Sequence, residues 1–387
     1  MRIVLVCDTY PPVLGGSEIE AQRVSAALIR AGHQVHVLCS GGPPMPAVRE
    51  WIDPEGVPVS ILTRTSKNKS KDLAFALRVA SHILENRRNY DIVYFLMQGL
   101  HVAAGLPAAR LAGIPVVMKI SGDGIVSAMA RSRAGRLELR LLRKWRLPLM
   151  LLNEAMFGEA IANGFPRDQL TWMPNPVDIG AFRPPAPGES DEWRTRHGLP
   201  LDAGIVIYTG RLSPEKGLRS LVGGFALAAR KRANSVLLLI GDGPIRSELQ
   251  ELAQAQGLNE MQIRFIGLVE ASQIPAWLRA SDLFALTSPN EGFSCSLLEA
   301  MATGLPSLVS GIPANLQLVD PGVHGLTVRH DDEAGIGEAI LRLLDHPAER
   351  SRMSRAARQR VSEKYSTERI VARYEALFSE AVKQQRP

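Results

Sequence analysis

The chain has few cysteines and no clustered metal ligands. Its three cysteines, Cys7, Cys39 and Cys295, are widely spaced and odd in number, which argues against a disulfide framework. Cys7 and Cys39 lie in apolar, strand-like runs, so we expect reduced thiols and a cytoplasmic protein. The eight histidines are scattered and no Asp-x-Asp pair occurs, so we predict that no metal is required.

Long apolar runs are also lacking. The longest apolar stretch, residues 99–118, is interrupted by Pro107 and Arg110, which excludes a membrane span there. The N-terminal MRIVLVCD enters a strand-like run directly, without the charged segment and cleavage site of a secretory leader, so no leader is expected.

The charge and composition are those of a globular protein. A net charge of +6 on 387 residues, with 45% hydrophobic and 22% charged residues, suits an anionic ligand or a membrane surface. No aromatic-plus-basic repeat or zinc-finger spacing occurs, so nucleic acid is not an expected partner. The length predicts two domains of similar size.

Short apolar runs alternate with helical segments in both halves of the chain. The strand-like runs of the first half are residues 2–7, 34–38, 92–95 and 115–120, and those of the second half are 205–208, 235–240, 263–266, 283–286 and 307–309. A break rich in proline and glycine at 182–190 separates the two series. This alternation predicts two Rossmann-like, doubly wound parallel sheets. Ser17 and Glu20 have the spacing of a capping box for the first helix.

Two charged loops carry most of the functional information. Arg211 and Lys216 follow the strand at 205–208, where ligands bind in open α/β sheets. Arginine can grip phosphate oxygens in a bidentate fork, and lysine supplies a compact charge. Glu291 and Glu299 flank the start of a helix predicted from Cys295, and paired carboxylates can accept hydrogen bonds from vicinal hydroxyls. A nucleotide-sugar carries both phosphates and hydroxyls, so the two loops together predict a nucleotide-sugar as the ligand.

Helix starts next to glycine offer further anion contacts. Gly15 and Gly16 precede the first helix, where backbone N–H groups and the helix dipole favour a phosphate, although a tight turn is the alternative interpretation. The helix predicted after Gly292 has free N–H groups in its first turn that could hold a diphosphate. Glu299 lies among apolar residues, so its carboxylate needs a partner.

These residues together resemble glycosyltransferase family 4, the retaining GT-B enzymes. The motifs that carry the resemblance are the early Gly-Gly turn, GRLSPEKG, IGDGP, EGF…LLEAMATGLP, MPNPVD and VDPGVHGLTV. The similarity covers nearly the whole chain. It implies two domains facing across a cleft, residues 1–180 on the acceptor side and 181–365 on the donor side. The last helix, 366–387, is expected to pack back on the first domain.

The resemblance also assigns roles to particular residues. Arg211 and Lys216 would hold the donor diphosphate and stabilise it as it leaves, while Glu291 would contact the donor sugar and Glu299 the ribose. The other expected donor contacts are Gly15, Gly16, Phe293, Ser294 and Cys295, with the base near Leu268 and Val269. No cofactor beyond a UDP- or GDP-sugar donor is implied, and the acceptor would be a carbohydrate or a lipid-linked sugar.

One segment departs from the family pattern. Many members have a histidine where this chain has Ser121, in MKISGDG, and Lys119 and Asp123 lie beside it. Some members carry a lysine-serine version, so activity is still expected. Lys119 either serves the cleft or packs its stem in the core with its head in solvent. His101 is a candidate substitute base, although a lone histidine in GLHVAAG favours a structural role.

The residues leave several functions open. The expected activity is hexosyl transfer in polysaccharide, glycolipid or glycoconjugate synthesis. The alternatives are a catalytically inactive nucleotide-sugar-binding scaffold, or an epimerase or phosphorylase on the same fold. Arg136, Arg140 and Arg143 recur on one face of a basic helix within 131–146, which could contact the cytoplasmic membrane face. An ordinary helix with its apolar side in the core is the favoured interpretation.

Overall fold

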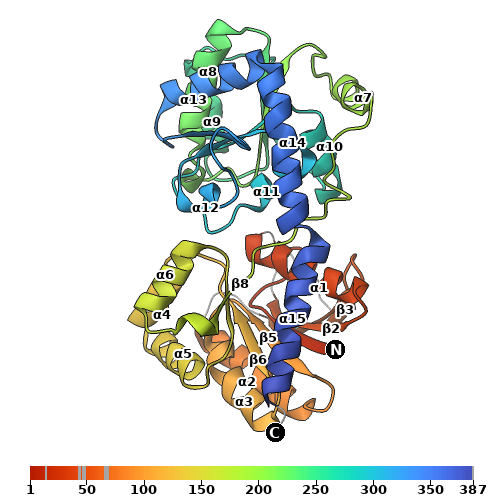
Figure 1. Ribbon diagram of the computed structural model, residues 1–387, viewed down its shortest axis with the longest axis vertical. Coiled ribbons are helices and arrows are strands. Elements are labelled where there is room, and N and C mark those ends of the chain that lie inside the picture. The colour runs from red at the N-terminus through yellow and green to blue at the C-terminus, as the bar shows by residue number, and fades with distance from the viewer. Residues whose placement is uncertain (14, 42–44, 46–48, 65–68, 386–387) are drawn as a thin grey trace. The chain divides into compact units, whose positions relative to one another are not determined.

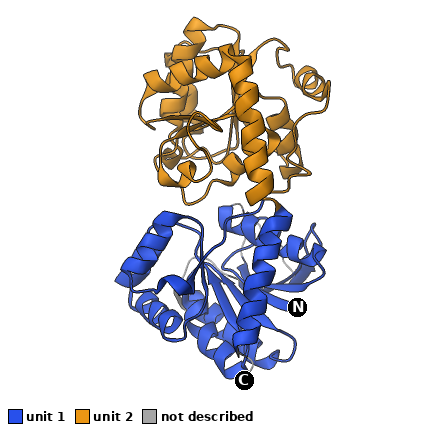
Figure 2. Ribbon diagram, in the orientation of Figure 1, with its two compact units in different colours: residues 1–176, 367–387 blue, residues 177–366 orange. Residues whose placement is uncertain are grey.

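The computed structural model describes residues 1–13, 15–41, 45, 49–64 and 69–385. The chain divides into two compact units, which Figure 2 shows in separate colours. Unit 1 comprises Met1–Pro176 together with Thr367–Pro387, and unit 2 comprises Val177–Ser366. Each unit is a mainly parallel sheet with helices packed against it (Figure 1).

Unit 1 contains an eight-stranded sheet in the order β3-β4-β2-β1-β5-β6-β7-β8. Its strands are β1 (Arg2–Val6), β2 (Gln34–Gly41), β3 (Glu50–Ile52), β4 (Pro58–Arg64), β5 (Ile92–Leu96), β6 (Val116–Lys119), β7 (Leu149–Leu151) and β8 (Leu170–Trp172). All neighbours pair in parallel except β3 and β4. The chain moves outward from β1 through β2 and then returns to β5 on the other side of β1, which makes a topological switch point between β1 and β5.

The helices of unit 1 cover the buried strands. They are α1 (Gly16–Arg30), α2 (Lys69–Glu85), α3 (Leu100–Ala112), α4 (Ile125–Arg131), α5 (Arg133–Lys144), α6 (Glu154–Ala162) and α15 (Thr367–Gln385), with a 3₁₀ turn at Arg167–Gln169. β1 and β5 are uniformly apolar beyond the first residue of β1 because both faces of a central parallel strand are covered. Ile370, Tyr374 and Phe378 of α15 share the core formed by β1 and β2.

Unit 2 contains a six-stranded, all-parallel sheet in the order β11-β10-β9-β12-β13-β14. Its strands are β9 (Gly204–Thr209), β10 (Ser235–Ile240), β11 (Ile263–Gly267), β12 (Leu283–Leu286), β13 (Ser307–Ser310) and β14 (Gly325–Val328). Its helices are α7 (Glu189–Arg196), α8 (Leu218–Lys231), α9 (Arg246–Ala255), α10 (Ile274–Arg279), α11 (Cys295–Thr303), α12 (Pro313–Leu316), α13 (Glu333–Asp345) and α14 (Pro347–Lys364). Two 3₁₀ turns lie at Pro214–Lys216 and Ala271–Gln273.

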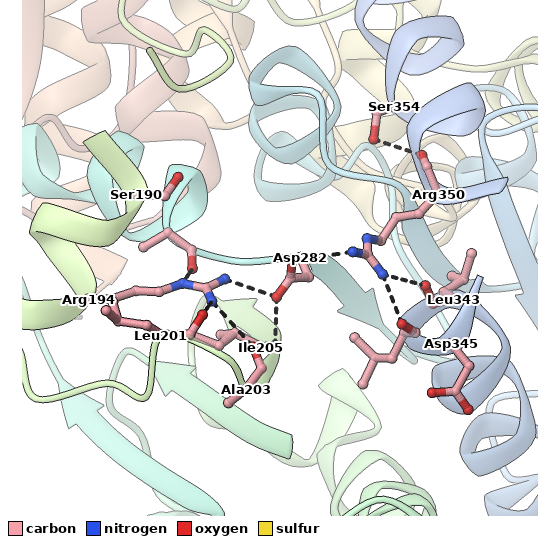
Figure 3. A network of polar contacts seen from close by, with 12 residues as sticks. Ser190, Arg194, Leu201, Ala203, Ile205, Asp282, Leu343, Asp345, Arg350 and Ser354 are labelled. Atoms are coloured by element: carbon pink, nitrogen blue, oxygen red, sulfur yellow. Dashed lines mark hydrogen bonds and ion pairs between the residues drawn. The ribbon is translucent and has the colours of Figure 1, made fainter. Parts of the chain in front are cut away.

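A polar network around Asp282 connects α7, β9 and α14 at the amino-terminal edge of the sheet of unit 2 (Figure 3). Arg194 of α7 donates from Nη2 to Asp282 Oδ2 at 2.9 Å, and the backbone N–H of Ile205 donates to the same oxygen at 2.9 Å. Arg350 of α14 approaches Asp282 Oδ1 at 3.8 Å and donates to the carbonyl of Leu343 at 2.9 Å. Because Arg194 is only 7% exposed, its guanidinium depends on these partners.

The structure corrects two local predictions. The capping box at Ser17 and Glu20 is wrong, because Gly15 is the N-cap of α1 and no side chain caps it. Glu20 instead lies buried on the inner face of α1. The basic helix predicted within 131–146 is confirmed as α5, but its bounds are corrected to Arg133–Lys144, since α4 ends at Arg131. Ser132 lies between the two helices and caps α5, accepting from the N–H of Gly135 at 2.9 Å.

Candidate functional site

The switch point of unit 2 lies between β9 and β12. The chain runs from β9 outward to β10 and β11 and then returns to β12 on the opposite side of β9. The loops that follow β9 and β12 therefore diverge at the carboxyl edge of the sheet, which is where open α/β sheets bind ligands. Lys216 lies in the first loop and Glu291 in the second.

Lys216 and Glu291 meet across this switch point. Lys216 Nζ donates to Glu291 Oε1 at 2.8 Å, and Ser288 Oγ donates to the same oxygen at 2.8 Å. The Glu291 side chain is 9% exposed and that of Lys216 is 26% exposed, so the lysine keeps contact with solvent. The structure thus brings together a cation and a carboxylate that the sequence places in separate motifs.

Arg211 precedes Lys216 in the same loop and is exposed. The Tyr208 hydroxyl donates to the Arg211 carbonyl at 2.9 Å, which fixes the backbone rather than the guanidinium. Burial raises the pKa of Tyr208, so this hydroxyl remains a donor. The Arg211 side chain can therefore swing toward an anion while its backbone stays anchored.

Glycines hold the cation loop against its neighbours. Gly217 has φ +65, and a Cβ there would lie 2.1 Å from the Thr287 carbonyl oxygen. A Cβ on Gly241 would lie 2.0 Å from the Gly210 oxygen, and one on Gly243 would lie 2.2 Å from the Leu212 oxygen. The IGDGP motif therefore works as a close backbone contact that supports the loop carrying Arg211 and Lys216.

The helix predicted after Gly292 is present as α11. It begins at Cys295, and Ser294 caps it by accepting from the N–H of Leu297 at 3.2 Å. Glu299 lies on this helix and is 8% exposed, as its apolar surroundings predict.

The other donor contacts predicted in unit 2 lie at the same edge of its sheet. Phe293 and Ser294 are buried and Cys295 is half-buried. Leu268 is 67% exposed and follows β11 directly, with Val269 beside it. An exposed leucine at the end of a strand offers an apolar surface to a flat ring.

Sequence reasoning missed the polar support beneath Glu291. Thr287 Oγ1 donates to the Gly217 carbonyl at 2.9 Å, which ties the two loops together. Ser310 Oγ donates to the Ser288 carbonyl, and Asn315 Nδ2 donates to Ser310 Oγ at 3.0 Å. The signal in the sequence was the run of small polar residues in TSPNEGF, which is typical of an ordinary turn until its partners are known.

In unit 1, Lys119 forms a buried polar centre at the end of β6. The lysine is fully buried, pairs with Glu20 of α1 and donates to Asn175 Oδ1 at 3.0 Å. It also donates to the Tyr374 hydroxyl at 3.3 Å. Burial acts to lower the pKa of Lys119, but Glu20 and Tyr374 together outweigh it and hold the pKa above its ordinary value. Nothing in the sequence indicates Glu20 as the partner.

Ser121 and Asp123 extend this centre toward the carboxyl edge. Ser121 Oγ donates to Glu20 Oε2 at 3.0 Å, so Lys119 and Ser121 hold the same carboxylate. Asn153 Nδ2 donates to Asp123 Oδ1 at 2.8 Å, and burial raises the pKa of Asp123. The residue that replaces the family histidine is thus part of a preformed hydrogen-bond network.

His101 lies in the core of unit 1 instead of at its surface. Its ring is 4% exposed and packs against Phe75 and Phe95. Burial lowers the pKa of His101 to about 4, so the ring is neutral near pH 7. A Cβ on Gly99 would lie 2.8 Å from this ring. The geometry favours the structural interpretation over that of a base.

The Gly15-Gly16 turn leads into α1 as predicted, but a carboxylate lies beside it. Thr9 Oγ1 donates to Glu18 Oε1 at 2.5 Å, and Ser17 Oγ donates to Glu18 Oε2 at 2.9 Å. A Cβ on Gly15 would lie 2.2 Å from Glu18 Oε2, whereas one on Gly16 would meet nothing within 4 Å. The space beside this turn that a ligand could occupy therefore lies at Gly16.

Metal-ligand clusters and membrane-spanning helices are both lacking in the described ranges. In them, no group of three or more His, Cys, Asp or Glu side chains is arranged to hold a metal ion. No helix in that part of the chain has both the length and the apolar character of a membrane span.

Two family models match the chain in succession. The model described as "Glycosyl transferase 4-like domain" matches residues 15–176, and the one described as "Glycosyl transferases group 1" matches residues 189–360. The first match falls within unit 1 and the second within unit 2. Together they cover most of both units.

Relatives and solved structures agree with these matches. The chain is 26% identical to the 2-deoxystreptamine glucosyltransferase of Streptomyces kanamyceticus, over 90% of this chain and 94% of that protein. It is 24% identical to the N-acetyl-alpha-D-glucosaminyl L-malate synthase of Bacillus anthracis, over 99% and 98%. The Anabaena protein Alr3699/HepE, solved with UDP and glucose, superposes with a TM-score of 0.80 at 22% identity, covering 98% of this chain and 100% of that one. The chain therefore belongs to the group 1 glycosyltransferases of family 4, and it is a glycosyltransferase with the two-sheet GT-B fold.

Proposed function

We propose that the protein transfers a hexosyl group from a UDP- or GDP-sugar to an acceptor hydroxyl with retention of anomeric configuration. The observation that carries this proposal is the ion pair between Lys216 and Glu291 at the switch point of unit 2. In this pair, Lys216 is the cation that would bind the diphosphate, and Glu291 is the carboxylate that would accept from the sugar hydroxyls. The UDP and glucose in the solved Anabaena protein support a UDP-sugar as the first donor to test.

The roles of the donor groups follow the family resemblance, and the meeting of Lys216 and Glu291 at one edge of the sheet supports them. Arg211 and Lys216 neutralise the diphosphate, and the N-terminus of α11 faces it with the positive end of its dipole. Glu299 accepts hydrogen bonds from the ribose hydroxyls. The backbone at Phe293, Ser294 and Cys295 positions the sugar. The base lies against Leu268 and Val269.

The chemistry depends on stabilising the leaving group. As the bond from the anomeric carbon to the phosphate oxygen breaks, negative charge grows on the diphosphate, and Arg211 and Lys216 meet that charge. The acceptor oxygen bonds to the anomeric carbon on the same face, and its proton passes to the departing phosphate oxygen. No side-chain nucleophile is needed, so Glu291 serves as a sugar contact. No step requires a metal.

The acceptor is assigned to unit 1. Lys119, Ser121 and Asp123 lie at the end of β6, at the carboxyl edge of the sheet, where an acceptor hydroxyl can approach. We infer that the two units face each other across a cleft that closes on the donor, with Gly16 approaching the diphosphate. Small-angle scattering should record compaction with saturating donor, and an unchanged radius of gyration would contradict closure.

Contact with the cytoplasmic membrane face is a separate part of the proposal. Arg136 and Arg140 of α5 are exposed and share a face, and Leu137 beside them is 48% exposed. Such a helix can lie on anionic lipid and reach a lipid-linked acceptor. Flotation with anionic liposomes should be lost when Arg136 and Arg140 are changed to Glu. Flotation that persists in this variant would remove α5 from the proposal.

The test of the donor site is a thermal-shift panel of UDP-, GDP- and ADP-sugars. A ligand at about a hundredfold above its Kd stabilises a protein by about 2.7 kcal/mol, which gives a visible shift. We expect a shift with one nucleotide class that disappears in Arg211→Ala with Lys216→Ala. A shift that persists in the double variant would refute the assignment of these residues.

Transfer itself must be separated from binding alone. The wild type should release the nucleoside diphosphate and form a glycoside with a supplied sugar acceptor, and Glu291→Ala should abolish both. The anomeric configuration of the product, read by NMR coupling constants, tests retention. Donor binding without hydrolysis or transfer would favour a nucleotide-sugar-binding scaffold, and reversible phosphorolysis would favour a phosphorylase.

A further inference from the structure

Unit 1 contains a cavity at the amino-terminal edge of its sheet. It has a volume of about 430 Å³ and is bordered by residues that precede or begin β6, β7 and β8, together with α3 and α15. This volume is within the usual range for small-molecule sites. Because these strands run parallel, their amino ends lie at the opposite edge from Lys119 and Ser121. The cavity is therefore separate from the acceptor site proposed above.

Gln169 anchors the wall of this cavity. Its side chain is more than nine-tenths buried, with 5% exposed. Nε2 donates to the carbonyl oxygens of Leu142 at 2.8 Å and Leu147 at 2.7 Å, which fixes the turn between α5 and β7. Among the described residues, Gln169 Oε1 has no hydrogen-bond partner. An unpaired acceptor in a buried site is costly unless another donor meets it.

Arg146 lines the cavity in a backbone conformation that suits glycine. Its φ is +49. It occupies the position after the cap of α5, where the Arg146 N–H donates to the Arg143 carbonyl at 3.1 Å and the Leu147 N–H to the Leu142 carbonyl at 3.1 Å. Glycine is the usual residue in this motif because the left-handed region is strained for other residues. Strain of this kind is often found at functional sites.

The side chain of Arg146 forms an exposed ion pair with Asp168, another lining residue, at the rim. Arg110 of α3, also in the lining, lies over the Trp145 ring, 5.2 Å from its centroid. Glu380 of α15 completes the charged lining. The lining therefore contains two arginines, two carboxylates, the indole of Trp145 and the amide of Gln169.

We propose that this cavity binds a neutral carbohydrate, a mono- or disaccharide. The balanced charges give no net attraction for a phosphate, and the polar rim does not suit an apolar ligand. Carboxylates accept from sugar hydroxyls, arginines donate to them, and Trp145 offers an apolar edge. The site does not depend on the transfer chemistry of the proposed function.

The test uses the full-length protein and two arginine variants. Binding of glucose, mannose, N-acetylglucosamine and maltose is measured by saturation-transfer NMR and calorimetry, with inorganic phosphate as the anionic probe. Arg146→Gly should weaken binding of the preferred sugar at least tenfold. It should leave the melting temperature unchanged or raise it by ~2 °C, because glycine relieves the strain. Arg87→Gly, at an exposed arginine outside the cavity, should change neither the affinity nor the location of binding.

The outcomes separate this site from the acceptor site. Protection of α15 and the 145–148 turn from hydrogen exchange on adding sugar, lost in Arg146→Gly, supports the proposal. Sugar binding that is unchanged in Arg146→Gly places the ligand elsewhere and overturns it. Binding of phosphate alone, or of no probe, overturns the carbohydrate assignment. Arg211→Ala should leave sugar binding at this cavity intact even if the proposed donor site fails.

Discussion

Lys216 and Glu291 are separated by 75 residues in sequence, yet their side chains meet at 2.8 Å at the carboxyl edge of one sheet. The pair is partly exposed on the lysine side and nearly buried on the glutamate side. Under the proposed function, an incoming diphosphate carries more charge than a single carboxylate and would draw Lys216 away from Glu291. Glu291 would then accept from a sugar hydroxyl, and the ion pair would couple recognition of the phosphates to recognition of the sugar.

The first prediction concerns removal of this lysine. Lys216→Ala should weaken donor binding by a factor of about 10–100, because a charge-assisted contact to phosphate is lost. The free energy of unfolding should fall by less than about 1 kcal/mol, because a partly exposed ion pair contributes little. Calorimetry with the preferred nucleotide-sugar and thermal melting of the free protein measure the two effects.

A matched control lies in the same unit. Arg219 forms an exposed ion pair with Glu248 on the neighbouring helices α8 and α9. Arg219→Ala removes one cation and one ion pair, as Lys216→Ala does, but its partner is Glu248 of α9 and not Glu291. Its donor affinity should equal that of the wild type. Equal losses in the two variants would show that net charge, and not the position of Lys216, controls binding.

The second prediction concerns Gly217, where backbone conformation and close approach coincide. With φ +65 and a prospective Cβ 2.1 Å from the Thr287 oxygen, Gly217→Ala must move one of the two loops. We expect a loss of more than about 3 kcal/mol in stability together with impaired donor binding. Gly257→Ala shares a positive φ of +81 but meets nothing within 4 Å. It should cost about 1 kcal/mol, the strain alone, and urea unfolding of both variants tests the difference.

The sequence predicted the fold well because hydrophobic period and turn residues are local signals. The apolar runs at 205–208 and 283–286 correspond to β9 and β12, and the helix expected from Cys295 begins there. Length and alternation were enough to indicate two parallel-sheet units. Each of these features depends on neighbours in sequence, so tertiary context did not need to be known.

The local errors arose where tertiary contacts outweigh local pattern. Ser17 and Glu20 have capping-box spacing, but Glu20 turns inward because Lys119 and Ser121 provide its partners about a hundred residues away. His101 is not such an error, because the structural role favoured for it agrees with the packing of Phe75 and Phe95 against its ring. Buried polar partnerships join distant elements, and a single sequence does not encode which groups will meet.

The third prediction tests the buried pair of Lys119 and Glu20. Lys119→Met should lower the stability of unit 1 by about 3–5 kcal/mol, because Glu20 is left as an uncompensated buried charge. Adding Glu20→Gln removes that charge while keeping an acceptor for Ser121, so the double variant should be more stable than Lys119→Met alone. Urea unfolding of the full double-mutant cycle measures the coupling. Additive losses would mean that the two side chains do not interact.

The fourth prediction is a pH dependence that originates in Glu138 of α5. This carboxyl is 2% exposed, and burial raises its pKa to about 8, although the Gly99 N–H donates to Oε2 at 3.4 Å and acts in the opposite direction. The folded state therefore holds a proton that the unfolded chain releases near its ordinary pKa of 4.5. The contribution of Glu138 to the free energy of unfolding is therefore complete below pH 4.5 and is lost as the pH rises through about 8.

Glu138→Gln keeps the shape of the protonated carboxyl and cannot ionise. The wild type should lose on the order of a few kcal/mol of stability between about pH 5 and 9 from this group, since a tenfold difference in proton affinity between the folded and unfolded states is worth about 1.4 kcal/mol. The variant should show a flatter profile and should exceed the wild type in melting temperature above about pH 8. His101 has the opposite sign, because burial lowers its pKa to about 4 and its contribution is lost as pH falls below about 6.5. His101 is present in both proteins, so its effect is common to the two profiles. Parallel profiles for Glu138→Gln and the wild type from about pH 5 to 8 would show that Glu138 ionises in the folded protein near its ordinary pKa.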